Sequence, residues 1–388
     1  MDRRSLLAAL AAGAAGVVTG LPGAARTQER KADDLKKRTE DAVEKGLEWL
    51  RKTQAPDGHW AAQGGQYPTS MTALAGMCLL MEGSTLKEGK YSDQIRKAVD
   101  WFLAGNRQQA NGLLGDVRNP TESTRYMYGQ GFGTMFLASV YGEEEDEEQR
   151  KKLEKTLKKA VEFICKGQTN KKHRKPEGKE VEIGGWGYVS AADGGNFDEG
   201  SVTITAMQGL RAARNAGIPV PKESIQKATD YLEACTTPKG GVIYSYAGGN
   251  GAALNGQERP PLTAAAVACS FSAGQYKGDL AKKWIKYCKD NIPVAKGRIA
   301  HDEYQNYYFA QFVYVLGEDR YGDLFPNEDK NNWMTWSKYR EAMYPYILDQ
   351  QDKNAGNWTG GYVGPVFATA TNLTILQLEK GILPIYQR

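Results

Sequence analysis

The sequence predicts an all-α protein, an (α/α)6 toroid with an inner and an outer ring of helices. A helix followed by a turn, at residues 42–60, recurs in about six copies along the chain, at a period of roughly 50–70 residues. In each copy, an amphipathic helix is paired with a helix that is apolar nearly all round. Such pairs bury their apolar faces only against neighbouring pairs, and a closed ring gives every pair two neighbours.

The first 25 residues are predicted to be a signal peptide. Arg3 and Arg4 precede a small and apolar stretch, and the small residues 22–25 provide a cleavage site. The arginine pair resembles a twin-arginine signal, so we expect export to the periplasm or beyond. A retained membrane anchor is the alternative. No later stretch of the sequence is apolar enough to span a membrane, so no transmembrane segment is expected in the mature chain.

One domain is expected after the signal peptide. Residues 26–36 are charged and should form a flexible lead-in, and residues 37–388 are long enough for a single large toroid. The formal net charge of +4 is small for 388 residues, and the sequence has no basic stripe with interleaved aromatics. Nucleic acid is therefore not expected as a partner.

The first copy of the repeat shows how the elements are recognised. Val43, Leu47 and Leu50 recur at helical spacing between charged residues, which predicts an amphipathic helix with one buried stripe. A Pro-Asp-Gly turn follows and leads to an aromatic residue. The next helix, at 70–81, is apolar nearly all round and is expected to be buried on every side.

The remaining copies repeat this pairing, and the fifth is degenerate. Their inner helices are rich in Gly and Ala, which lets helices pack closely in a crowded inner ring. The amphipathic helices are expected around 95–102, 157–164, 225–232, 280–287 and 339–347, and their buried partners around 129–138, 201–207, 263–269, 304–316 and 366–378.

The chain has five cysteines, none of them in a C-x-x-C pair. Cys78 and Cys269 lie in apolar helical runs and are predicted to be small core residues. The expected oxidising destination leaves open a single disulfide among Cys165, Cys235 and Cys288.

The turn of the first repeat resembles a known motif. Residues 54–60, from Gln54 to Trp60, resemble the Q-W repeat of squalene and oxidosqualene cyclases, and the pairs Gln168/Trp186 and Gln351/Trp358 look like further copies. The chain from about residue 36 onward is similar to bacterial secreted proteins that carry prenyltransferase/squalene-oxidase repeats. Further similar runs are 128–132, 210–218, 307–311 and 383–388. The resemblance implies a terpenoid-cyclase/prenyltransferase-like α/α toroid and little chemistry.

The motifs of the enzymes with this fold are missing from the sequence. Class II terpene cyclases protonate an alkene with a D-x-D-D acid, whereas the acidic cluster at 193–199 has different spacing. Zinc prenyltransferases use Asp and Cys before one inner helix and His before another. Asp198 precedes the third inner helix, but no Cys follows it and no His opens the sixth. Both activities are therefore disfavoured, and no metal or cofactor is predicted.

Four polar residues remain as catalytic candidates: Asp198, Glu199, His301 and Asp302. They precede the third and fifth inner helices, so they could meet at one mouth of the barrel. Two carboxylates and a histidine could carry out acid/base chemistry on a sugar. The alternative is that these residues simply begin and cap helices.

Aromatic residues cluster near the expected ends of the inner helices. Their rings could line a cavity for an isoprenoid or stack on sugars; the alternative is ordinary core packing. The cavity-lining candidates are Tyr67, Tyr126, Tyr128, Phe132, Tyr188, Tyr304, Tyr307 and Tyr308.

Three functional hypotheses follow. The leading one is a toroid of unassigned activity that binds an apolar, isoprenoid-like or extended small molecule in the central cavity, or a protein partner at its rim. The alternatives are an isoprenoid-processing enzyme without the usual motifs, and a carbohydrate-active lyase or hydrolase. An isoprenoid site needs a deep, dry cavity, whereas a sugar enzyme needs an open groove with carboxylates about 5–10 Å apart.

Overall fold

The computed structural model describes residues 22–246, 256–272, 278–295, 302–361 and 363–387. These residues contain twelve α-helices, α2 to α13. The outer helices are α2 (Pro22–Thr53), α4 (Ser92–Leu103), α6 (Glu147–Lys166), α8 (Lys222–Ala234), α10 (Asp279–Asn291) and α12 (Trp336–Asp349). The inner helices are α3 (Pro68–Glu82), α5 (Pro120–Tyr141), α7 (Gly200–Asn215), α9 (Pro260–Ser272), α11 (Asp302–Leu324) and α13 (Pro365–Gln377).

Short elements connect the helices. An antiparallel hairpin of β1 (Lys171–Arg174) and β2 (Glu180–Ile183) lies between α6 and α7, and Lys171 pairs with Ile183 in its register. The 3-10 turns are η1 (Gln63–Gly65), η2 (Ala191–Asp193), η3 (Lys330–Asn332), η4 (Leu378–Lys380) and η5 (Pro384–Tyr386).

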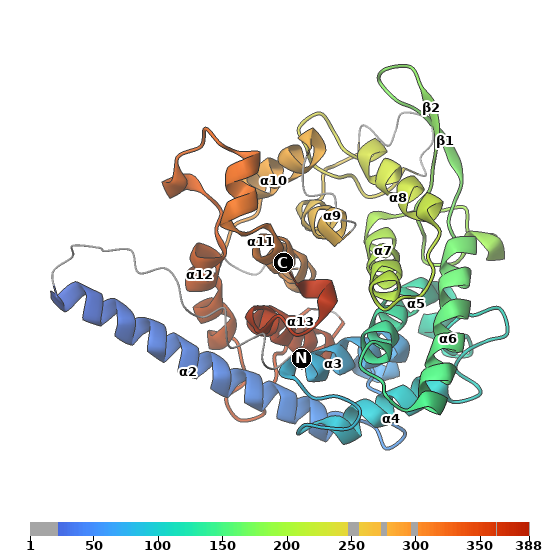
Figure 1. The fold of residues 1–388 in the computed structure, drawn as a ribbon, viewed down its shortest axis with the longest axis horizontal. Helices are drawn as coiled ribbons and strands as arrows, with labels where there is room; N and C mark the ends of the chain where they lie inside the picture. Colours follow the sequence, from blue (N-terminus) through green and yellow to red (C-terminus); the bar gives the residue numbers. More distant parts are fainter. Residues whose placement is uncertain (1–21, 247–255, 273–277, 296–301, 362, 388) are drawn as a thin grey trace.

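The helices form two concentric rings, which confirms the predicted α/α toroid. Viewed down the ring, the inner helices surround the centre and the outer helices enclose them (Figure 1). Each inner helix packs on the next, from α3 through α5, α7, α9 and α11 to α13, and α13 packs on α3. The ring is therefore closed and every inner helix has two inner neighbours.

The two kinds of helix bury their surfaces as the sequence pattern predicts. In α4, the residues Ile95, Ala98, Val99 and Phe102 are buried on one face, while charged residues occupy the other. In α3, every residue from Pro68 to Met81 is buried. An inner helix therefore contacts protein on all sides, which explains why its sequence has no polar face.

Glycines allow the inner helices α5 and α7 to approach closely. A Cβ atom at Gly131 would lie 2.7 Å from the backbone oxygen of Thr205, and one at Gly209 would lie 2.6 Å from the backbone oxygen of Gly131. Both distances are shorter than a van der Waals contact, so a larger residue would push the two helices apart. The small residues of these inner helices thus have a packing role.

The Q-W units link neighbouring helices. The Gln54 amide donates to the carbonyl of Gln94 in α4 (2.9 Å), and the Trp60 indole N–H donates to the carbonyl of Leu50 in α2 (2.8 Å). The backbone N–H of Trp60 donates to the Thr72 hydroxyl in α3 (3.0 Å). One unit therefore joins its own outer helix, the following inner helix and the next outer helix.

The same bonds recur in the other two units. Gln168 donates to the carbonyl of Ser224 in α8 (2.9 Å), and Gln351 donates to the carbonyl of Ala42 in α2 (2.8 Å). The indole N–H groups of Trp186 and Trp358 donate to carbonyls of α6 (2.6 Å) and α12 (2.7 Å). The bond from Gln351 to α2 joins the last outer helix to the first, so it closes the outer ring.

The N-terminal segment differs from the expectation. Residues 26–36, which we expected to form a flexible lead-in, continue the helix α2. This long helix extends past the ring in Figure 1. The predicted signal peptide falls largely outside the described residues.

The cysteines carry free thiols. All five are described; Cys165 is half-buried, and Cys78, Cys235, Cys269 and Cys288 are buried. Burial raises the pKa of the Cys78 thiol to about 12, as expected for an inert core residue. Among the described residues, no helix is both long and apolar enough to cross a bilayer.

The C-terminal segment fills the axis of the inner barrel. After α13, the turns η4 and η5 contact α3, α7 and α11, and the end of the chain lies at the centre of the ring (Figure 1). Leu383, Ile385 and Tyr386 are buried there. The hydroxyls of Tyr386 and Tyr307 lie 2.9 Å apart, so the segment is hydrogen-bonded to α11 inside the barrel.

Candidate functional site

Polar and aromatic side chains meet where the inner helices α5, α7 and α11 begin. We call this end of the barrel the mouth. Glu199 is the N-cap of α7, and its side chain accepts hydrogen bonds from the backbone N–H groups of Ser201 (2.9 Å) and Val202 (2.8 Å). These are N–H groups that the first turn of a helix leaves without an internal partner.

Glu199 is fully buried and also bonded by side chains. The Ser201 hydroxyl donates to its carboxyl group at 2.7 Å, and the Tyr128 hydroxyl from α5 donates to Oε1 at 3.2 Å. The hydroxyls of Tyr128 and Ser201 lie 2.5 Å apart. Burial raises the pKa of Glu199, although these hydrogen bonds oppose the shift. The carboxyl group therefore keeps its proton to a higher pH than an exposed glutamate.

Four aromatic rings form a continuous group beside Glu199. We call Tyr128, Tyr188, Phe197 and Tyr244 the platform. Ring centres lie 6.0 Å apart between Tyr128 and Tyr188, 6.4 Å between Tyr188 and Phe197, and 6.4 Å between Phe197 and Tyr244. The hydroxyls of Tyr188 and Tyr244 are hydrogen-bonded to each other. Phe197 and Tyr244 are 43% and 38% exposed, so the platform faces solvent.

Asp198 is held away from the platform by the hairpin. Its carboxylate forms an ion pair with Lys171 of β1 and accepts a hydrogen bond from the Thr169 hydroxyl at 3.2 Å. Its other oxygen, Oδ1, is buried and has no hydrogen-bond partner among the described residues. The adjacent carboxyls of Asp198 and Glu199 therefore have different partners, the first at the hairpin and the second at the mouth.

Asp302 lies in a different pocket. It lines a polar pocket between α11, α12 and α13 together with Glu303, Asn306, Gln350 and Asn372. His301 lies outside the described residues. Of the four catalytic candidates, the structure thus places Glu199 beside the aromatic residues of the mouth and Asp198 against the hairpin, while Asp302, although it begins α11, lines the pocket beside α12.

Several of the predicted aromatic residues do gather near Glu199. Tyr128 and Tyr188 belong to the platform. Burial, together with nearby Tyr308, Tyr128 and Glu199, raises the pKa of Tyr304 well above the ordinary value. Tyr304 and Tyr308 pack edge to face with ring centres 4.8 Å apart. These two residues continue the aromatic lining from the mouth into the barrel along α11.

The other predicted aromatic residues have structural contacts. Tyr126 accepts a hydrogen bond from the Ser190 N–H (2.8 Å) and donates to Asp193 (2.5 Å), so it fixes the loop before α7. Tyr67 is the N-cap of α3, in a left-handed conformation with φ 49°. Tyr307 bonds the C-terminal segment as described above, and Phe132 is buried one helical turn after Tyr128.

Phe197, Tyr244 and Ser201 belong to the site but were not among the sequence candidates. An alignment of the repeats indicates that Tyr244 lies at the mouth. Trp186 and Val242 each donate a backbone N–H to a threonine of the following inner helix, at 2.9 Å in both cases. Tyr188 and Tyr244 lie two residues after these positions, so aligning the repeats by this bond places both tyrosines at the mouth.

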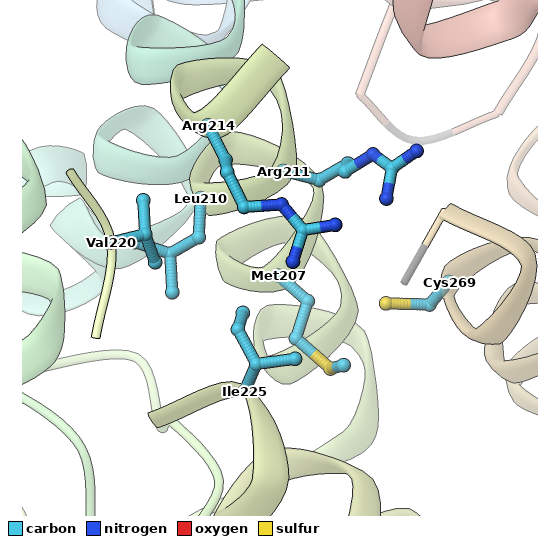
Figure 2. A pocket seen from close by; sticks show the side chains of 7 residues that line it. All are labelled: Met207, Leu210, Arg211, Arg214, Val220, Ile225 and Cys269. Atoms are coloured by element: carbon cyan, nitrogen blue, oxygen red, sulfur yellow. The ribbon is translucent and has the colours of Figure 1, made fainter. Parts of the chain in front are cut away.

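A separate apolar pocket lies between α7, α8 and α9 (Figure 2). It is lined by Met207, Leu210, Val220, Ile225 and Cys269, and Arg211 and Arg214 extend from α7 beside it. Its volume of about 10 Å³ suits one water molecule. The pocket lies toward the other end of α7, so it is not part of the mouth.

The described residues hold no group of three or more His, Cys, Asp or Glu side chains placed to bind a metal ion. The mouth instead offers hydrogen-bonding hydroxyls, one buried carboxyl group and exposed aromatic faces. Such a site can bind a ligand that has both apolar faces and hydroxyl groups, and it can donate a proton from Glu199.

Comparison with known proteins reveals similarity in fold only. No family model matches the chain, and no curated protein matches it in sequence. An inactive variant of the α-1,6-mannanase GH76A of Salegentibacter sp., in complex with α-1,6-mannotriose, matches with a TM-score of 0.56 and 10% identity, over 88% of this chain and 99% of the mannanase.

Two further solved structures are similar. A variant of the type II terpene cyclase MstE from Scytonema, in complex with geranylgeranyl dihydroxybenzoate, matches with a TM-score of 0.51 and 14% identity, over 89% of this chain and 98% of the cyclase. A protein from Actinoplanes matches with a TM-score of 0.51 and 15% identity, over 87% and 98% of the two chains. The chain therefore has the α/α-toroid fold that is found in both glycoside hydrolases and terpene cyclases.

Proposed function

We propose that this protein is exported and binds a glycan at the mouth of its inner barrel. Sugar rings would stack on the platform while their hydroxyls bond to Glu199, Ser201 and Tyr128. The observation that carries the proposal is the group of exposed aromatic rings beside a buried, hydrogen-bonded carboxyl group. Sugars present apolar C–H faces and hydroxyl groups together, so they match both parts of such a site. The export rests on the predicted twin-arginine signal.

The surroundings of the platform favour a glycan over an isoprenoid. An isoprenoid is bound best in an enclosed apolar cavity, because its whole surface is removed from water there. Phe197 and Tyr244 are instead open to solvent. The barrel axis is occupied by Tyr386, and the amides of Gln208 and Gln311 bond to each other from α7 to α11 at 3.0 Å. These features leave the mouth as the preferred place for a ligand.

A second candidate function is hydrolysis of the bound glycan with Glu199 as the general acid. The observation in its favour is the burial that raises the pKa of Glu199, because a general acid must hold its proton near the working pH. The fold likeness to an α-1,6-mannanase supports the same class of substrate. We would detect hydrolysis by new reducing ends, which a Glu199→Gln variant should no longer produce.

Glycan binding is tested by isothermal titration calorimetry with the mature protein. The ligands are α-1,6-mannooligosaccharides and a panel of other neutral and acidic oligosaccharides. Phe197→Ala and Tyr244→Ala should each weaken binding by roughly 3- to 10-fold, since one stacked ring contributes about 0.5–1.5 kcal/mol. Both side chains are exposed, so the fold should tolerate these changes.

The matched control is Ile382→Ala. Ile382 is 41% exposed, like the platform residues, but follows α13 and η4, away from the mouth. Its replacement should leave glycan binding unchanged. The proposal fails if no oligosaccharide binds, or if the control weakens binding as much as the platform variants. An isoprenoid that copurifies with the protein, seen by native mass spectrometry, would instead support the apolar-ligand hypothesis.

A further inference from the structure

We propose that Lys171 and Asp198 become joined by an amide bond between the lysine Nζ atom and the carboxyl carbon of the aspartate. This covalent bond fastens the hairpin of β1 and β2 to the start of α7. Three features of the pair point to it: its burial, an unsatisfied oxygen of Asp198, and the neutral side chains around it. The bond is a modification of the chain itself and does not depend on glycan binding.

The two side chains are in direct contact and largely removed from water. Asp198 is fully buried, and the Lys171 side chain is only 18% exposed. The register of the hairpin pairs Lys171 with the buried Ile183, so Lys171 lies on the face of β1 that is turned toward the rest of the protein. An ion pair in this setting costs free energy, because both charges lose their hydration.

Only one oxygen of the Asp198 carboxylate has partners among the described residues. Lys171 and the Thr169 hydroxyl both bond to Oδ2, whereas Oδ1 is buried and accepts no hydrogen bond from the described part of the chain. A buried carboxylate oxygen normally accepts hydrogen bonds, because its negative charge is otherwise uncompensated. The amide bond removes this cost, since Oδ2 leaves in a water molecule and Oδ1 becomes the oxygen of a neutral amide.

Neutral side chains of α8 lie near the pair. Asp198 and Lys171 both act electrostatically on the buried thiol of Cys235. Burial, together with Cys235 and Asp198, raises the pKa of Tyr231 well above its ordinary value, so this fully buried phenol keeps its proton. Its hydroxyl meets no acceptor in hydrogen-bonding geometry among the described residues. Such a buried O–H group can stabilise the negative charge that develops on Oδ1 when the nitrogen attacks.

The condensation of Lys171 with Asp198 needs no further reactant. One proton first passes from the ammonium group to Oδ2, with which it is in contact, and both groups become neutral. The nitrogen lone pair then forms a bond to the carboxyl carbon, and the electron pair of the C–Oδ2 bond leaves with that oxygen. The nitrogen loses a second proton, which the Thr169 hydroxyl can pass to Oδ2. One water molecule is released, and an amide with one N–H remains.

Two other lysines of this segment show what distinguishes Lys171. Lys172 pairs with Glu180 at 3.0 Å, but these side chains are 75% and 61% exposed, so water solvates both charges. Lys175 is shared by two carboxylates, and its hydrogen bonds to Glu233 and Asp230 raise its pKa. Lys175 therefore keeps the proton that a nucleophilic amine must lose. Of the three lysines, Lys171 combines a fully buried carboxylate with a single ion-pair partner among the described residues.

The bond is tested on the wild-type protein by mass spectrometry after denaturation and digestion with trypsin. An amide on Lys171 blocks cleavage there, so the fragment 167–172 should be recovered joined to the fragment 180–211. The joined species should have the summed mass of the two fragments less one water molecule, and its fragment ions should locate the link at Lys171 and Asp198. Recovery of separate, unmodified fragments 167–171 and 180–211 overturns the proposal and leaves an ordinary ion pair.

Variants assign the link to this pair. Lys171→Arg should give no link, because a guanidinium group keeps its charge and is a poor nucleophile. Lys172→Arg is the matched control in the same strand and should leave the link intact. Tyr231→Phe preserves the ring and should lower the linked fraction of the purified protein. A link that persists in Lys171→Arg, or that is lost in Lys172→Arg, would assign it to another lysine and contradict the proposal. The wild-type digest decides the question even where a variant fails to fold.

Discussion

At the scale of single residues, position decides what each of two adjacent carboxyl groups does. Asp198 and Glu199 are neighbours in sequence and both are fully buried. The first is paired with a lysine of the hairpin, while the second caps α7 and reaches the mouth. Burial disfavours the ionised form of Glu199 and raises its pKa. The protonation of Glu199 can therefore respond to the environment of the mouth.

This difference predicts how Glu199 affects stability as the pH changes. Its pKa in the folded protein is raised above the ordinary 4.5, so below pH 4.5 both folded and unfolded chains are protonated and the group carries no penalty. As the pH rises through the folded-state pKa, the unfolded chain ionises more easily and the protein loses stability. The Tm of the wild type relative to Glu199→Gln should thus fall as the pH rises above 4.5.

A glutamate whose pKa is shifted in the opposite direction serves as the control for this comparison of Tm values. Glu154 is partly exposed, and the hydrogen bond from Lys158 lowers its pKa. The Tm of the wild type relative to Glu154→Gln should rise slightly with pH. A lowered folded-state pKa adds stability only above the pKa that the group has in the unfolded chain. A Tm difference for Glu199→Gln that stays flat or rises with pH would show that burial does not control this carboxyl group.

At the scale of elements, the repeat is a set of links between helices. The three Q-W units use the same residue types to make the same bonds, although they lie far apart in the chain. A glutamine amide fits this position because it can donate two hydrogen bonds at once, for example from Gln351 to the carbonyls of Ala42 and Gly356. The outer helices are thereby held in register with each other.

Replacing Gln351 tests the link that closes the outer ring. Gln351→Ala leaves the carbonyl of Ala42 in α2 without this donor, so we expect a loss of about 1–3 kcal/mol in the free energy of unfolding. Gln350→Ala is the matched control, because among the described residues that amide donates only to the carbonyl of Tyr346, in the helix that Gln350 caps. Urea unfolding of both variants measures the difference. Equal losses would mean that the link from α12 to α2 has no special role.

The elements were predictable from sequence because their signal is periodic. The alternation of amphipathic and all-apolar helices gave the helix pairs and the closed ring, and the small inner residues anticipated close contacts such as that of Gly131. The bend of α5 at Arg125 was not predictable, since the N–H of Met127 bonds there to the carbonyl of the distant Tyr188. The helical start of residues 26–36 was also missed, because charged residues are compatible with an exposed helix as well as with a flexible segment.

At the scale of the whole molecule, the site depends on which loops the ring brings together. Tyr188 and Tyr244 come from different repeats, and Glu199 and Tyr128 come from different inner helices. Sequence reasoning found Glu199, Tyr128 and Tyr188 because they lie near helix starts. Sequence reasoning could not distinguish these site residues from Tyr126, which was also predicted to line the cavity. The side chain of Tyr126 leaves α5 in another direction and bonds to Asp193. The occupant of the barrel axis was also hidden, because it comes from the end of the chain.

The C-terminal segment leads to the last prediction, which concerns the filled barrel. Tyr386 is buried among α3, α7 and α11, and its hydroxyl meets that of Tyr307. Tyr386→Ala should lower the free energy of unfolding by about 3–5 kcal/mol, because it removes a large buried side chain and leaves a cavity. Gln387→Ala is the control, as the side chain of this exposed residue donates to the carbonyl of Gly381 within the same segment. Urea unfolding should separate the two variants clearly. If Tyr386→Ala is as stable as the control, the segment does not help to hold the barrel together, and the axis could then open to an apolar ligand.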